Sequence, residues 1–108
     1  WIAWGAISMS RHAIDILIDR TMPDEEVAIV RRILDAEEGC MSYHRLRTRT
    51  AGHVRYVDVH IVVRNEWSVV QAHDLADKIE KRIQSELHPS YVVVHVDPYD
   101  TSKADRQP

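Results

Sequence analysis

Residues 54–63 carry apolar side chains at alternate positions, which is the pattern of a β-strand with one buried face. Residues 41–50 also alternate, with arginines at 45, 47 and 49 on the face opposite His44. Ala51-Gly52 supplies a turn between the two runs, so we expect a β-hairpin. A three-residue loop would put His44 directly opposite His60, whereas a two-residue loop would turn the two side chains to opposite faces.

Apolar stripes at helical spacing flank this hairpin. One helix should start near Pro23, which is favoured at a first helical position, and end before Gly39. A second should start at Ser68, which forms a capping-box pair with Gln71, and a strand over residues 91–96 follows it. The order helix-strand-strand-helix-strand predicts a two-layer α+β domain, a ferredoxin-like arrangement without its first strand. The open sheet face makes a homodimer plausible.

The first ten residues carry no charge and include Trp1 and Trp4, a residue type that gathers at membrane interfaces. The stretch is shorter than the roughly 20 residues that a helix needs to cross a bilayer, and it lacks the basic start of a signal peptide. We expect residues 1–20 to be the end of a membrane helix; the alternative is an amphipathic helix packed on the domain. Residues 21–98 would form the domain, and residues 99–108 a polar tail.

Composition limits the function classes that this chain can serve. With 108 residues the chain has the size of one domain with one core. The net charge is −3 and the basic residues are scattered, which argues against nucleic acid as a partner. The single cysteine, Cys40, cannot form an intrachain disulfide, and we expect a buried structural thiol rather than a metal ligand.

Histidines near carboxylates are the most informative polar residues of this chain. His95 and Asp97 are two residues apart on a predicted strand, so their side chains should converge on one side. Neutral imidazole with carboxylate suits zinc or a similar divalent ion. Asp58 shares a face with His60 and could orient it, whereas His73, taken alone, reads as a solvent-facing helix residue. No nucleophile motif supports an enzyme. The candidate metal ligands are His44, His60, His73, His95 and Asp97.

Several short motifs, in this order, carry a resemblance to a known family. They are Ile16-Leu17-Ile18-Asp19-Arg20, Pro23-Asp24-Glu25-Glu26, His44-Arg45-Leu46-Arg47-Thr48-Arg49 with Gly52, Val59-His60-Ile61, Gln71-Ala72-His73 and His95-Val96-Asp97-Pro98. From Asp15 to Pro98 the chain resembles the end of a cation diffusion facilitator transporter, namely its last membrane helix and its cytoplasmic C-terminal domain. It looks closest to the bacterial zinc- and iron-efflux branch.

The resemblance implies a homodimeric inner-membrane protein that exports zinc or related divalent cations in exchange for protons. Its C-terminal domain would lie on the cytoplasmic side, with a metallochaperone-like fold and a two-metal site near the dimer interface. The family ligands match the five candidates named above, with Asp97 as the bridging carboxylate and His73 as a residue that could reach the site across the interface. Asp19 matches an acidic residue of a charged interlock that holds the dimer together at the membrane.

Other interpretations remain open at this stage. Imidazole and carboxylate also suit iron, cadmium, cobalt and manganese, so zinc is only the first expectation. The chain could instead be a ferredoxin-like ligand-binding or dimerisation module with incidental histidines. A metal hydrolase would need an open coordination position and a substrate cleft, of which the sequence gives no sign.

Overall fold

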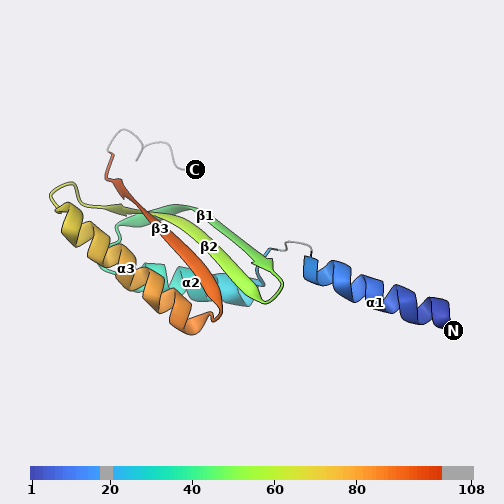
Figure 1. The fold of residues 1–108 in the computed structure, drawn as a ribbon. Helices are drawn as coiled ribbons and strands as arrows, with labels where there is room; N and C mark the ends of the chain where they lie inside the picture. The colour runs from blue at the N-terminus through green and yellow to red at the C-terminus, as the bar shows by residue number, and fades with distance from the viewer. Residues whose placement is uncertain (18–20, 101–108) are drawn as a thin grey trace.

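The computed structural model describes residues 1–17 and 21–100. Its elements are α1 (Ile2–Leu17), α2 (Asp24–Ala36), β1 (Ser42–Ala51), β2 (Val54–Val63), α3 (Val69–Glu86) and β3 (Ser90–Pro98). The strands form one sheet in the order β1-β2-β3, with α2 and α3 against one of its faces (Figure 1). The predicted two-layer α+β fold is therefore confirmed. Asp19 and the last eight residues of the predicted polar tail lie outside the described residues.

The central strand β2 organises the sheet. It pairs antiparallel with β1 and parallel with β3, and the parallel register sets His60 beside His95. Parallel strands need a crossover connection, which α3 provides here. Ser68 begins α3 as predicted, because its hydroxyl accepts a hydrogen bond from the backbone N–H of Gln71 at 3.1 Å and its own N–H donates to the Gln71 side chain.

The hairpin loop has two residues, and not the three that would put His44 opposite His60 in a regular hairpin. Ala51 pairs with Val54, and Gly52 lies between them with φ 61°, a conformation that favours glycine. With this loop alone, His44 and His60 would face opposite sides of the sheet. A β-bulge between His44 and Arg47 corrects the parity, and His44 still pairs with His60.

The bulge also changes which residues of β1 share a face. Arg45 is the extra residue and has φ 52°, in the left-handed region. Beyond it, Leu46 packs against the core, while Arg47 pairs with Asp58. His44 therefore lies on the same face as Arg47 and not opposite to it, contrary to the simple alternation expected from the sequence.

The core lies between the sheet and the two helices that cover it. Its most deeply buried side chains come from the sheet and from both helices. β2 supplies Val59 and Ile61, α2 supplies Val30, and α3 supplies Ile79 and Ile83, each 0% exposed. Each such aliphatic side chain stabilises the fold by about 1.5–3 kcal/mol relative to an exposed one. The apolar face of β2 thus turns toward the helices, and its polar face turns away.

Helix α1 extends away from the domain (Figure 1). Every α1 side chain that the structure describes is exposed, including Trp4 and Ile7, so the alternative of a helix packed on the domain is not observed. None of the described helices combines the length and the apolar character that a membrane span requires.

Candidate metal centre

Three neighbouring strands bring the candidate ligands together on the face of the sheet that the helices leave open. His44 lies on β1, His60 on β2, and both His95 and Asp97 on β3. His44 pairs with His60 across the antiparallel ladder, and His60 pairs with His95 across the parallel one. Paired residues of adjacent strands point to the same face, so three imidazoles form a row across the sheet.

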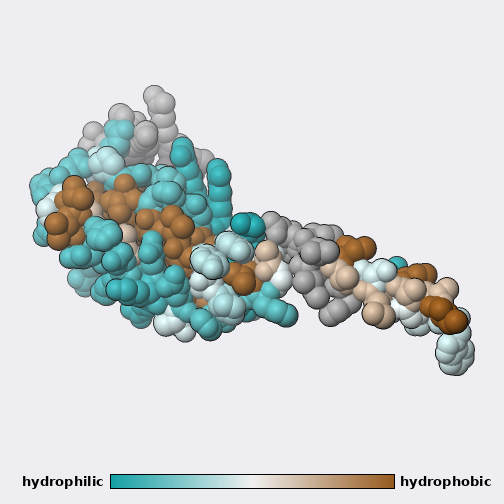
Figure 2. Space-filling view, viewed as in Figure 1, coloured by the Kyte–Doolittle hydropathy of each residue, from teal (hydrophilic) through white to brown (hydrophobic). Residues whose placement is uncertain are grey.

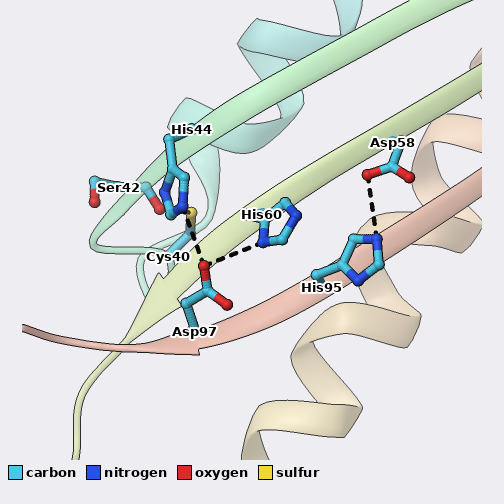
Figure 3. Close-up of polar contacts among 7 residues, drawn as sticks. All are labelled: Cys40, Ser42, His44, Asp58, His60, His95 and Asp97. Carbon is cyan, nitrogen blue, oxygen red and sulfur yellow. Dashed lines mark hydrogen bonds and ion pairs between the residues drawn. The ribbon is translucent and has the colours of Figure 1, made fainter.

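Asp97 contacts two of these three imidazoles, those of His44 and His60 (Figure 3). One of its carboxylate oxygens, Oδ2, lies 3.1 Å from His44 Nε2 and 3.1 Å from His60 Nδ1. A zinc ion with bonds of about 2.0–2.1 Å to nitrogen and oxygen holds tetrahedral ligand atoms about 3.3 Å apart. Two imidazole nitrogens and a carboxylate oxygen at this spacing therefore need only small shifts to share one cation. We call His44, His60 and Asp97 the first triad.

The other half of the row contains a second carboxylate. Asp58 Oδ1 lies 3.2 Å from His95 Nε2, and the rings of His60 and His95 stack with centroids 4.4 Å apart. Ligand atoms of Asp58, His60 and His95 all lie within 4.8 Å of one another. We call these three residues the second triad. His60 belongs to both.

This arrangement differs in two details from what the sequence suggested. Asp97 contacts His44 and His60, whereas His95, two residues earlier on β3, contacts Asp58. The sequence predicts Asp58 only as a partner that orients His60. The parallel pairing of His60 with His95 could have pointed to Asp58, because it sets β3 beside both of these β2 residues. That pairing joins strands far apart in the chain, so the sequence alone does not reveal it.

His73 is not brought to the cluster within this chain. It lies on α3, which covers the other face of the sheet, and its side chain is 69% exposed. Its Nε2 lies 3.5 Å from Asp77 Oδ2, one helical turn further on. Neither triad includes it. A contribution from His73 across a dimer interface stays a prediction.

Cys40 lies beside the cluster but does not join it (Figure 3). Its thiol donates to the carbonyl of Ser42 at 3.3 Å. Burial raises the pKa of the thiol, and the negative charges of Asp35 and Glu37 raise the pKa further. A protonated, half-buried thiol is a poor metal ligand, which agrees with the structural role expected for it.

A cavity of about 630 Å³ lies at the connection between β2 and α3, and its lining includes Trp67, Val69 and Tyr99. The triad residues do not line this cavity. We therefore place the candidate site on the row of imidazoles, where the potential metal ligands lie, and not in this cavity.

Comparison with known proteins identifies the family of this chain. The family model described as the cytoplasmic domain of cation efflux proteins matches residues 22–99. The cation-efflux pump FieF of Cronobacter sakazakii is 37% identical over 98 residues, which are 91% of this chain and 33% of that protein. FieF of Klebsiella pneumoniae is 35% identical over 107 residues, which are 99% of this chain and 36% of that protein. The chain thus spans about a third of the length of these relatives.

Solved structures show the same relationship. CzrB, a candidate zinc transporter, superposes with a TM-score of 0.69 at 31% identity, covering 73% of this chain and 99% of that chain. The zinc form of CzrB gives a TM-score of 0.69 at 29% identity, covering 84% and 100%. The metal-bound C-terminal domain of CzcD from Thermotoga maritima gives 0.64 at 27% identity, covering 71% and 94%. The chain belongs to the cation efflux, or cation diffusion facilitator, family, and residues 22–99 are its cytoplasmic domain.

Proposed function

We propose that this domain binds zinc on its open sheet face and regulates a transporter that exports divalent cations in exchange for protons. The observation that carries the proposal is the position of Asp97, whose Oδ2 lies 3.1 Å from imidazole nitrogens of both His44 and His60. These three side chains come from three different strands, and neutral imidazole with carboxylate is a ligand set suited to zinc.

The solved structures of similar proteins support zinc as the cation. CzrB is named as a candidate zinc transporter and has a structure in a zinc form, and the CzcD domain is described as metal-bound. Four imidazoles and one carboxylate exceed the needs of one tetrahedral ion, so we propose two cations per protomer, with His44, His60, His73, His95 and Asp97 as ligands. Iron, cadmium, cobalt and manganese are possible alternatives at the same ligands.

Metal binding would act on the transporter through a homodimer. The open face carries exposed apolar side chains, among them Tyr91 at 65% and Val93 at 48%, next to the candidate ligands. Figure 2 shows hydrophobic surface over β3 within a largely hydrophilic domain. A second copy that covers this face would shield the apolar side chains, and a bound cation would offset the negative charge of the carboxylates there. Only a metal that binds the closed dimer better than the open one can shift this equilibrium.

Helix α1 would connect the domain to the inner membrane, with the domain on the cytoplasmic side. We propose that residues 1–20 are the end of a membrane helix, because Trp1, Ile2 and Trp4 are at least 78% exposed and would be covered by lipid there. Asp19, outside the described residues, would join the charged interlock of the dimer. The chain would bind and sense cations without making or breaking covalent bonds, so we propose no enzymatic activity.

Equilibrium dialysis against zinc tests this function. We expect about two ions per chain, and an unfolding temperature that rises with zinc concentration because the ligand binds only the folded state. The double variant His95→Ala with Asp97→Ala should lose this zinc-dependent rise while keeping the metal-free fold. The matched control is His53→Ala with Asp74→Ala, which removes the same residue types outside the cluster. Absence of zinc uptake by the natural chain would instead favour a dimerisation module with incidental histidines.

A further inference from the structure

Asp58 is the one carboxylate of the cluster to which the family resemblance assigns no role. It is 49% exposed, and its side chain turns toward His95 on β3. Its register partner on β1 is Arg47, yet within residues 1–17 and 21–100 the only ion pair of Asp58 is the one with His95. The carboxylate therefore lies against an imidazole nitrogen at 3.2 Å and forms no ion pair with the arginine opposite it on β1.

The second triad has the same composition as the first. Each contains two imidazoles and one carboxylate, and in each the ligand atoms lie within 4.8 Å of one another. His60 stands between them (Figure 3): its Nδ1 is 3.1 Å from Asp97, and its other ring nitrogen faces Asp58 and His95. A neutral imidazole has a single lone pair on one nitrogen and a proton on the other. His60 can therefore serve only one of the two triads at a time.

We infer that Asp58 is a further ligand of the second cation, so that the second triad makes a cation position from side chains of one protomer. This inference rests on the proposed function and extends its ligand set. When one cation is bound, His60 can complete either triad, and the tautomer of its ring decides which. When both are bound, His60 remains with Asp97 and His44, and the second cation has Asp58 and His95 as protein ligands. The second cation therefore binds more weakly than the first.

The inference separates cleanly from a model in which Asp97 is the only carboxylate ligand of both ions. In that model, Asp97→Asn removes the charge from both positions and Asp58 is dispensable. In ours, Asp97→Asn disables the first triad only, and the remaining binding depends on Asp58. Replacing a carboxylate by the isosteric amide removes its charge while keeping its shape.

Zinc titration in competition with a coloured chelator, on the chain in its present length, provides the test. We expect two binding events of unequal affinity in the natural chain and one in Asp97→Asn. Adding Asp58→Asn to Asp97→Asn should weaken the remaining event at least tenfold. As the control, adding Asp74→Asn in place of Asp58→Asn removes an exposed helix carboxylate and should leave the affinity of the remaining event unchanged.

Two results would overturn the inference while leaving the proposed function intact. One is that Asp97→Asn binds no zinc, and the other is that Asp58→Asn does not weaken the binding that remains. Failure of the natural chain to bind zinc would overturn the proposed function and the inference together. If Asp97→Asn does not fold, His44→Ala disables the first triad through a different residue, and the same addition of Asp58→Asn then decides the outcome.

Discussion

His44 lies opposite His60 although the loop that joins their strands has only two residues. The two facts are compatible because the bulge at Arg45 adds one residue to β1 and restores the parity that the loop removes. The first triad thus depends on a local irregularity of the strand, and Arg45 occupies a conformation, φ 52°, that costs an ordinary L-residue energy.

Arg45→Gly should therefore stabilise the domain, because glycine adopts positive φ without steric penalty. The gain should be up to about 1 kcal/mol in the free energy of unfolding, measured by urea denaturation. Arg45→Val should destabilise it by about 1–2 kcal/mol, because a β-branched side chain fits positive φ worst. Equal stability of the two variants would contradict a left-handed conformation at this position.

His44→Ala should remove most of the zinc-dependent stabilisation of the domain. His44 supplies one of the three ligands of the first triad, whereas His53 lies exposed in the hairpin loop. At a zinc concentration 100 times the dissociation constant, the natural chain should gain about 2.7 kcal/mol. His53→Ala should keep this gain, and thermal unfolding with and without zinc measures both. A similar loss in the two variants would show that the histidines act without a defined site.

Glu26 and Arg55 form a two-pronged ion pair that ties the start of β2 to the first turn of α2. Arg55 donates from Nε to Glu26 Oε2 at 2.8 Å and from Nη2 to Glu26 Oε1 at 2.6 Å, with the side chains only 26% and 21% exposed. Glu26→Gln should cost about 1–3 kcal/mol in urea unfolding, because it leaves a half-buried guanidinium without its carboxylate. Glu25→Gln, one residue earlier and exposed, should change stability by less than about 0.5 kcal/mol.

Gly39 allows Trp67 to pack closely against the segment that follows α2. A Cβ built at position 39 would overlap with Cη2 of Trp67 and lie 3.1 Å from Leu75 Cδ2. Gly39→Ala should therefore destabilise the domain by about 1–3 kcal/mol, because the indole ring must shift. Gly5→Ala in α1 is the matched control, since nothing lies within 4 Å of its Cβ. Urea unfolding should show a lower free energy of unfolding for Gly39→Ala than for Gly5→Ala. A free energy of unfolding unchanged by Gly39→Ala would contradict the close packing.

Cys40 should react slowly with iodoacetamide. Burial and the charges of Asp35 and Glu37 raise the pKa of its thiol, so at pH 8 less of the reactive thiolate is present than in a free cysteine. Asp35→Asn should speed the reaction by lowering this pKa, and Asp74→Asn, further along the chain on α3, should not. The Cys40 thiol keeps its proton to higher pH in the folded state than in the unfolded state. The contribution of Cys40 to stability is therefore present below the unfolded pKa and is lost as the pH rises through the folded pKa.

The sequence alone determined the order of the elements and the class of the fold. Alternation over residues 54–63 and the Ser68–Gln71 capping pair are local signals, because strand faces and helix starts depend on neighbouring residues. The choice of His44, His60, His95 and Asp97 as candidate ligands also came from the sequence, and the structure brings these four together on one face.

Only the tertiary structure decided how these ligands are grouped. The bulge at Arg45, the parallel pairing of His60 with His95 and the turn of Asp58 toward His95 depend on contacts between segments far apart in the chain. A strand's own sequence fixes which of its residues alternate, but its register against a neighbour follows from packing the whole core. For that reason the residue types of the site could be predicted from the sequence, while the two triads that share His60 could not.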